Sequence, residues 1–445
     1  MVKSVKVNLL LKFLLSFSVI FVLASQNNVF ARSIFELEAT VDGQTETEGF
    51  DNIFDFVRGF DTSELTDLFP NYTDASSVSS ILDIRGLQAK ARFRANSSIL
   101  TWDIPSLKIH ETFKGKTRDE SVDLFVDWLK GEGEGTLSKL MRGFIAKTPN
   151  DPVAGNPHSL MANLVSIDFD RAFNTSTTGE IETPETTTTE ASKEGVSEET
   201  PKEITYSNLM ALSPRFGSLR QGDLDNRQIT LPLSYTIRFN SDPRYKLTFS
   251  MPITWVEIAG ANSYSAGLGV GFTFPVMDRW SLTPAVNYGG VGSLDLGSLA
   301  QIISGSLTSI YSIPVNKYTI RIGNMGGYYR TLEIPFEFGG SLDAGLLDPN
   351  IGNTVFRNGV MVSIPTESLL KNTALELFFA DTRYFGSALF IDNYQEIGFA
   401  YGFNKTERKT IKDKIRNCLK DFRGGATYLY ADESEGYTVN FGYTF

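Results

Sequence analysis

The chain has 445 residues, enough for two or three domains, and a formal net charge of −11. So acidic a chain is a poor partner for nucleic acid, because phosphates attract basic patches. Its one cysteine, Cys418, excludes an intramolecular disulfide, so an exported form of the protein must be stabilised by burial or by a membrane.

Residues 1–31 have the pattern of a secretory signal peptide. Three lysines accompany an apolar stretch from about Phe13 to Ala24, and Val29-Phe30-Ala31 supplies a cleavage site of the small-x-small type. The apolar stretch is well short of the ~20 residues that a membrane-spanning helix needs. We therefore expect cleavage and export. No long uncharged apolar run follows, so membrane-spanning helices are not expected.

Residues 32–173 are expected to form a small soluble α+β domain. Apolar and polar residues alternate through 86–113, which predicts short strands. Apolar residues within 50–70 have helical spacing, and Thr117 with Glu120 forms a capping box at the start of another helix. Two more helices are expected, around 137–145 and 160–165. We expect strands followed by helices, packed in one module.

Residues 174–203 differ in composition from both of their neighbours. The segment carries eight glutamates and many threonines, with no aromatic residue. Such a sequence cannot bury enough apolar surface to fold, so it is predicted to be a flexible acidic linker.

Residues 204–445 repeat one pattern, about ten residues of apolar and polar alternation followed by a polar turn. Alternation alone also fits a soluble β-sandwich. Aromatic residues near both ends of the runs, together with the export signal, favour an all-β transmembrane antiparallel barrel of about 12 strands. The predicted strands are 205–216, 228–240, 245–256, 264–274, 279–289, 301–313, 317–329, 354–364, 373–381, 393–403, 424–431 and 436–445.

The connections between these strands predict which end of the barrel faces the periplasm. An even strand number and short periplasmic turns assign 240–243, 275–278 and 314–316 to the inner side. The longer connections 217–227, 290–300, 330–353 and 382–392 are then external. The long inner loop 404–423 has the pattern of a basic amphipathic helix, which is expected to lie on lipid headgroups, plug the barrel or pack on its own protein.

The last nine residues place a large apolar or aromatic side chain at every second position, which is one face of a strand. These residues are Tyr437, Val439, Phe441, Tyr443 and Phe445. The pattern resembles the C-terminal signal by which bacterial outer-membrane β-barrels are recognised for assembly. The resemblance implies location in the outer membrane of a Gram-negative bacterium. It also implies outer-membrane lipid and the export and barrel-assembly machinery as partners.

The predicted barrel also resembles the translocation unit of autotransporters in strand number, in length and in its terminal residues. Such units export a passenger and usually keep a helix in the lumen just before the first strand. The threonine-rich segment 174–203 is poor helix-forming sequence. We therefore expect no such helix, which argues against export of residues 32–173.

The chain offers little for catalysis. Barrel enzymes generally need a histidine as a base that titrates near neutral pH, and the chain has two, His110 and His158, neither in the barrel. Both are expected to be surface residues. No residues have metal-ligand spacing, so no enzyme activity, metal or cofactor is predicted.

Small inward residues such as Gly267, Gly269 and Gly271 leave room inside the barrel for a narrow channel or a folded-in segment. The preferred candidate plug is 330–353, which carries Phe336, Phe338 and Leu342. The N-terminal domain and the 405–422 helix are alternatives. Inward charges of both signs give no ion preference.

Two functions compete on this sequence. The first hypothesis is a non-enzymatic outer-membrane barrel, structural or a narrow porin-like pore, with a periplasmic N-terminal domain. The alternative is an autotransporter-like surface protein that exports its N-terminal domain for adhesion or binding. The sequence names neither a solute nor a surface ligand.

Overall fold

The computed structural model describes residues 33–58, 66–129, 136–173, 208–222, 224–336, 345–366, 373–403 and 422–444. The predicted signal peptide, the predicted linker, most of the 404–423 loop with Cys418, and Phe445 lie outside these residues. Their structural roles stay predictions.

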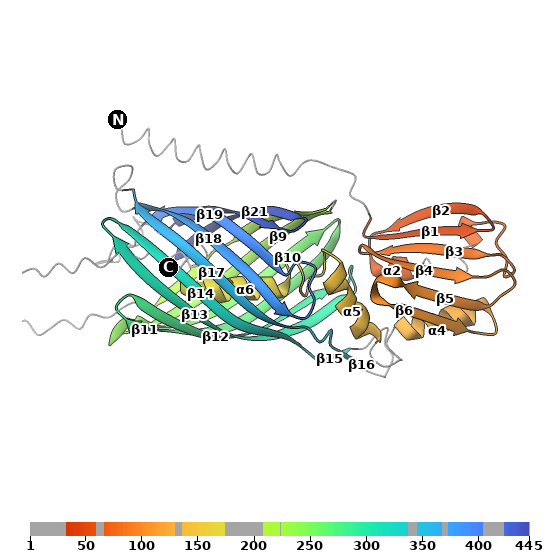
Figure 1. Ribbon diagram of the computed structural model, residues 1–445, viewed down its shortest axis with the longest axis horizontal. Coiled ribbons are helices and arrows are strands. Elements are labelled where there is room, and N and C mark those ends of the chain that lie inside the picture. Colours follow the sequence, from red (N-terminus) through yellow and green to blue (C-terminus); the bar gives the residue numbers. More distant parts are fainter. Residues whose placement is uncertain are drawn as a thin grey trace, which may run out of the picture. The chain divides into compact units, whose positions relative to one another are not determined.

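The C-terminal part is a closed antiparallel β-barrel of twelve strands, as predicted (Figure 1). Strands β7 (Leu209–Leu212) and β8 (Arg215–Gln221) both pair with β9 and β21, so they share one position in the wall and close it. The other strands are β9 (Leu224–Phe239), β10 (Asp242–Ile258), β11 (Ala261–Met277), β12 (Trp280–Ser293), β13 (Ser298–Val315), β14 (Tyr318–Leu332), β17 (Gly352–Pro365), β18 (Thr373–Gly386), β19 (Asn393–Phe403), β20 (Phe422–Ala431) and β21 (Ser434–Thr444).

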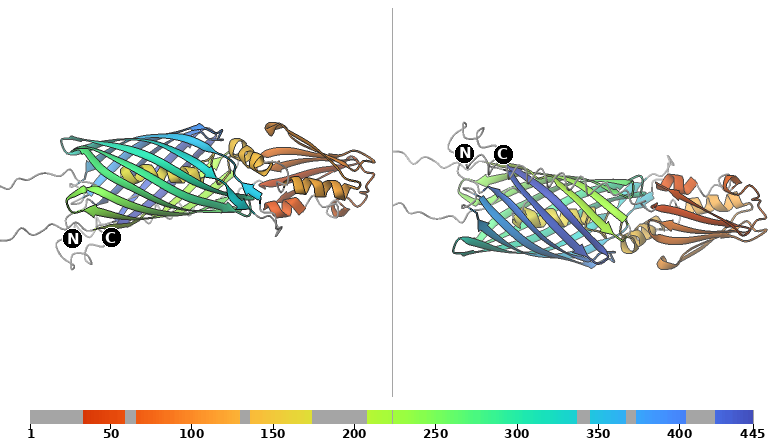
Figure 2. Two further views of the ribbon diagram at one scale, coloured as in Figure 1. Left: turned by 90° about the horizontal axis from the view of Figure 1, so that it is seen from below. Right: turned by 90° about the horizontal axis from the view of Figure 1, so that it is seen from above.

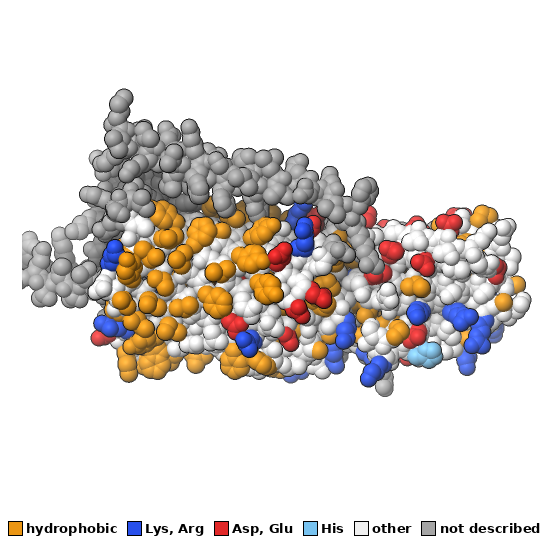
Figure 3. Space-filling view, turned by 45° about the horizontal axis from the view of Figure 1, so that its top comes forward, with side chains coloured by type: hydrophobic (Ala, Val, Ile, Leu, Met, Phe, Trp, Pro, Cys, Tyr) orange, Lys and Arg blue, Asp and Glu red, His pale blue; other side chains and the backbone are white. Residues whose placement is uncertain are grey.

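The outer face of the barrel is apolar, because the predicted alternation places every second side chain outward. Leu268, for example, is 61% exposed while its neighbours Gly267 and Gly269 are buried inside. Figure 3 shows these side chains gathered over one part of the barrel, with charged side chains over the remainder. The outward set includes Ile229, Leu231, Tyr235, Phe239, Tyr245, Phe249, Met251, Ile253, Val270, Val286, Tyr288, Ile303, Leu307, Tyr311, Ile322, Tyr328, Phe356, Val360, Leu377, Phe379, Ile397 and Phe399.

The barrel has two rims. The terminal rim is the one where β7 begins and β21 ends, next to the tight β9–β10 turn; the loop rim is the opposite one. Two connections predicted as loops at the loop rim, 217–227 and 290–300, are mostly strand, because β8, β9, β12 and β13 extend further than the apolar alternation does. The long connections that remain there are 333–351 and 387–392.

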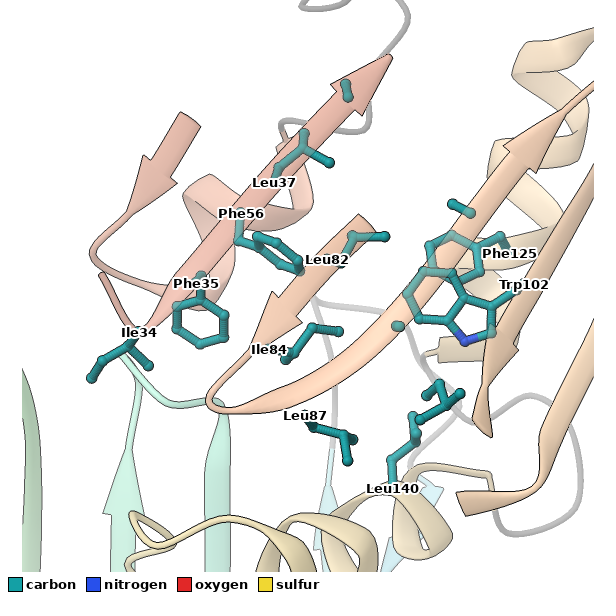
Figure 4. Packing of buried hydrophobic residues seen from close by; sticks show 14 of the residues in the cluster. Ile34, Phe35, Leu37, Phe56, Leu82, Ile84, Leu87, Trp102, Phe125 and Leu140 are labelled. Carbon is teal, nitrogen blue, oxygen red and sulfur yellow. The ribbon is translucent and has the colours of Figure 1, made fainter. Parts of the chain in front are cut away.

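The predicted N-terminal α+β module is present as a six-stranded antiparallel sheet with helices, in the strand order β2-β1-β3-β4-β5-β6. The strands are β1 (Phe35–Val41), β2 (Gln44–Phe50), β3 (Val78–Ile84), β4 (Leu87–Phe93), β5 (Ile99–Ile104) and β6 (Ile109–Lys114). One face of the sheet packs on α2 (Ile53–Arg58) and α4 (Arg118–Leu129) around Phe35, Leu82, Trp102 and Phe125 (Figure 4). The rings of Trp102 and Phe125 lie 4.6 Å apart.

The start of α4 forms as its sequence predicts. Thr117 Oγ1 accepts a hydrogen bond from the Glu120 N–H at 3.1 Å. The Glu120 carboxylate reaches back to the N–H of Lys116 at 2.6 Å, one residue before the usual capping-box partner. One N–H group of the first helical turn and the N–H of Lys116, which precedes the helix, are thereby satisfied.

Helix α6 (Leu160–Phe173) lies inside the barrel and not in the N-terminal module with which the sequence pattern grouped it (Figures 1 and 2). It packs against β11, β12, β13 and β14. Helix α5 (Thr136–Lys147) precedes it and contacts the loop rim, where Arg142 donates to the carbonyl of Pro349 at 3.0 Å. No helix in the described residues is long and apolar enough to cross a membrane.

Candidate functional site in the barrel lumen

Helix α6 crosses the lumen from the loop rim toward the terminal rim. Its first residue, Leu160, lies against Gly289 near the loop end of β12. Its last residue, Phe173, lies against Gly323 near the terminal end of β14. The expectation that the lumen holds no helix of this kind is therefore wrong: the helix is present, but earlier in the chain than the threonine-rich segment.

Glycines on the inner wall make the space for this helix. A Cβ on Gly323 would meet the Phe173 ring at 2.6 Å, and one on Gly359 would meet Phe169 at 2.8 Å. Cβ atoms on Gly269 and Gly271 would each come within 2.6 Å of the Arg171 side chain. The small inward residues that predicted a folded-in occupant are thus the ones that α6 contacts.

A buried polar node anchors the second half of α6. The Asp168 carboxylate pairs with Arg171 at 2.8 Å and accepts hydrogen bonds from Asn287 at 2.7 Å and from the Tyr329 hydroxyl at 2.7 Å. Arg171 also donates to Ser250 at 2.7 Å and to Asn287 at 2.9 Å. One carboxylate and one guanidinium therefore tie the helix to three strands, β10, β12 and β14.

The opposite side of α6 is held by separate contacts. Arg215 of β8 pairs with Asp170 at 2.8 Å and donates to Ser166 at 3.1 Å. Gln228 of β9 donates to the Asn163 side chain at 2.9 Å. The helix is thus bonded to the wall on both sides.

A polar cavity of about 50 Å³ remains between α6 and strands β8 and β17–β21. The Arg357–Glu396 ion pair, at 2.5 Å, lies on its wall, and the Arg357 guanidinium also stacks over the Phe169 ring. This is room for only a few water molecules. The lining residues are Ser166, Phe169, Asp170, Phe173, Arg215, Arg357, Phe378, Ala380, Glu396, Thr427, Thr438 and Asn440.

Residues 148–159 close the loop rim above the helix, and every described side chain from Asn150 to Ser159 is buried. The carbonyl of Gly155 accepts a hydrogen bond from Ile391 N–H in the β18–β19 connection. Gly155 has φ +88°, and a Cβ there would lie 2.4 Å from the Ile145 carbonyl oxygen, so only glycine fits. The segment is an ordered cap.

The two histidines differ in environment. His110 is exposed on β6, as predicted, 3.9 Å from Asp103. His158 is not a surface residue: it is 7% exposed within the cap, and burial lowers its pKa from the ordinary 6.5 to about 4. Its imidazole is therefore neutral at neutral pH, and the sequence pattern gave no sign of its burial.

Acidification should weaken the seated cap through His158. Because its pKa is lower in the folded state than in the unfolded chain, the unfolded chain binds more protons between pH 6.5 and 4, and stability falls as pH falls through that range. Hydrogen exchange of residues 150–165 in the purified protein should therefore speed up on going from pH 7 to pH 4, after correction for intrinsic rates. A His158→Gln variant should lose part of that acceleration; an unchanged pH profile in the variant would contradict the assignment.

The predicted plug, 330–353, is described in part, because residues 337–344 lie outside the described residues. Phe336 ends the short strand β15 (Ile334–Phe336), which pairs with β16 (Gly345–Leu347), and Phe338 and Leu342 are not described. Their plugging role stays a prediction, and α6 is the segment that the structure places in the lumen.

The residues of the predicted assembly signal lie on β21. Tyr437 is 54% exposed on the outer face, while Asn440 is buried inside, in keeping with the alternation. Val439 and Phe441 are partly exposed, and Tyr443 is paired with Phe422 in the backbone register. Recognition by assembly machinery is a separate matter and stays a prediction.

Sequence reasoning missed the anchoring residues of α6. The available signal was the helix itself, which is apolar on nearly every side yet ends in the Asp168-Phe169-Asp170-Arg171 run. A helix that is apolar all round is a buried helix. Charges at the end of such a helix need partners in the protein.

The site contains no cluster of metal ligands among the described residues. No group of three or more histidine, cysteine or acidic side chains lies close enough to hold a metal ion in that part of the chain. Several lumenal charges are paired with one another, as in Arg423 with Glu376 and Arg357 with Glu396. The arrangement can fix a helix in place and close the lumen.

No protein-family model matches the chain, and no curated protein matches it in sequence. In structure the barrel is similar to the β-domain of the Bordetella autotransporter BrkA, with 12% identity, a TM-score of 0.39, and coverage of 53% of this chain and 98% of that one. It is similar to the translocator domain of the autotransporter NalP from Neisseria meningitidis, with 12% identity and a TM-score of 0.38. The match covers 55% of this chain and 90% of that one. It is also similar to the KdgM porin, with 8% identity and a TM-score of 0.31. The match covers 52% of this chain and 99% of that one. The predicted antiparallel barrel of twelve strands is confirmed by the strand pairing of the structure itself.

Proposed function

We propose that this outer-membrane β-barrel holds its N-terminal sheet domain on the cell surface and stays closed by helix α6. It is a non-enzymatic, autotransporter-like display protein. The observation that carries the proposal is the path of α6 through the lumen, from the loop rim to the terminal rim. The proposal replaces the periplasmic placement of the N-terminal domain that the sequence favoured.

The orientation of the barrel supports an external loop rim. Bacterial outer-membrane barrels have short periplasmic turns and longer external loops. The longest connection, 333–351, belongs to the loop rim together with 387–392, while the terminal rim carries 404–421 and 366–372 besides its tight turns. Both ends of the barrel chain belong to the terminal rim. Ion pairs such as Arg220–Asp225 and Arg383–Asp381 lie on the outer wall toward the loop rim. Charged groups are costly against lipid tails, so this part of the wall is expected to stand outside the hydrocarbon layer.

The sheet domain is bonded to this same rim. Arg85, in the β3–β4 turn, donates to the Leu296 carbonyl at 3.2 Å and to Ser298 at 2.9 Å, both in the β12–β13 connection or at its edge. The N–H of Ile53 donates to the carbonyl of Asp295 at 2.9 Å. These contacts support an external position for the domain.

The proposal is tested by protease treatment of intact cells. A cleavable epitope tag in the exposed β1–β2 turn, after Asp42, should be removed from outside, whereas a tag at residue 190 should be protected. A matched tag in the β9–β10 turn, at Ser241, serves as the periplasmic control. Protection of the tag at Asp42 together with cleavage of the tag at Ser241 would overturn the orientation.

A further inference from the structure

One face of the N-terminal sheet is left uncovered by the described helices, and its charges are divided across the strands. Carboxylates occupy the β1 and β3 side of this face, and basic groups occupy the β4 and β6 side. The outer-face residues are Glu36, Glu38 and Asp83 on the acidic side and Lys90, Arg92 and Lys114 on the basic side. The Asp103–His110 pair lies among the basic groups.

The strand register places an apolar residue at the centre of this division. Glu38 of β1, Ile81 of β3 and Lys90 of β4 are direct neighbours in one row across the sheet. Ile81 is 42% exposed in the middle of β3, and the other exposed apolar side chain of this face, Ile99, lies at the start of β5 opposite Lys114. The face therefore has an apolar centre with opposite charges at equal distances on its two sides.

We propose that this face binds the same face of a second copy of the chain. A two-fold axis that runs along β3, between two stacked sheets, brings Ile81 onto Ile81 and places each Glu38 opposite the Lys90 of the other copy. An axis across the strands would instead set Glu38 against Glu38, so the charges select one arrangement. Aligned stacking of two sheets at this orientation is a common packing of β-sheets.

The size of the face sets the strength of this association. Six strands about 4.8 Å apart, each about 20 Å long, give a face of about 500 Å² per copy. The total is about 1,000 Å², the lower limit for a specific interface, so the pair should be weak and reversible. Many copies in one membrane would strengthen the contact through multivalency.

The test uses the full-length protein, one copy in each lipid nanodisc, so that association can occur only through the parts outside the membrane. Nanodiscs expose both membrane sides, so the result does not depend on the proposed orientation. Sedimentation velocity should show a reversible dimer that weakens with salt. Glu38→Lys alone and Lys90→Glu alone should each raise the dissociation constant at least about tenfold, because two attractive pairs become repulsive.

The decisive sample is an equal mixture of the two single variants. In the mixed pair, both contacts again join a lysine to a glutamate, so dimers should return, and the double variant should also dimerise. Asp123→Lys, an exposed reversal on α4 away from the face, should match the wild type. A wild type that stays monomeric at all attainable concentrations would overturn the proposal. So would single variants that dimerise normally, or a mixture that fails to recover.

Discussion

Replacing Asp168 with alanine should unseat α6 and raise the conductance of the barrel in planar bilayers from near zero to frequent open events. The change leaves the buried Arg171 and the Tyr329 hydroxyl without their partner. Removing one member of a buried, hydrogen-bonded charge pair costs about 3–5 kcal/mol. Most of that cost is avoided if α6 leaves the lumen, because Arg171 then reaches water.

Two variants separate the loss of the anchor from general damage. Asp168→Asn keeps the acceptor toward Tyr329 and should give fewer open events than alanine. The double variant, Asp168→Ala with Arg171→Ala, removes both charges. It should open the lumen less than Asp168→Ala alone, because no buried charge is left unpaired. Unchanged conductance in all three, with normal barrel assembly, would show that α6 does not gate the lumen.

Arg85→Ala should detach the sheet domain from the barrel without unfolding either part. Arg85 is 2% exposed, pairs with Asp151 at 2.7 Å, donates to Leu296 and Ser298, and lies over the Phe144 ring at 4.7 Å. Its loss leaves the Asp151 carboxylate, 1% exposed, without its cation, at a cost of about 3–5 kcal/mol. Limited proteolysis should then cut near 148–159 much faster than in the wild type.

A matched control for this prediction is Lys139→Ala on α5. Lys139 is exposed, and such surface changes usually alter stability by less than about 0.5 kcal/mol. Cleavage at the same rate in the Arg85 and Lys139 variants would show that the buried pair does not hold the domain in place.

The barrel could be predicted strand by strand because each wall residue meets either lipid or the lumen, so alternation carries most of the information. The N-terminal sheet was only half predicted. Strands β1, β2 and β3 were missed. The first two could have been found, because Asp42-Gly43, with φ of +47° and +89°, is a strong hairpin signal between alternating residues. The edge strand β2 is polar and exposed on both faces, so periodicity alone cannot find it.

The lumen was predicted only as space. The glycines at 267, 269 and 271 indicated that something occupies the lumen. Free space inside the barrel does not by itself say which segment of the chain fills that space. The pairing of Asp168 with Asn287 and Tyr329 joins residues 119 and 161 positions apart, and nothing local in the sequence encodes such partners. The low helix propensity of 174–203 stays a prediction, because these residues lie outside the described ones. The lumenal helix lies before this segment and does not adjoin the first strand.

The path of α6 makes the native chain a threaded one. A sheet of six strands is about 24 Å across, whereas the lumen is filled by a single helix about 10 Å wide. The folded sheet domain, on one side of the ring of strands, therefore cannot be drawn back through it. The chain must therefore be threaded before the sheet domain folds or before the barrel closes. Either residues 33–147 pass through the ring of strands before they fold, or the strands close around α6 when residues 33–147 already lie on the other side. Folding of the sheet domain after passage would make its transfer irreversible without any external energy source.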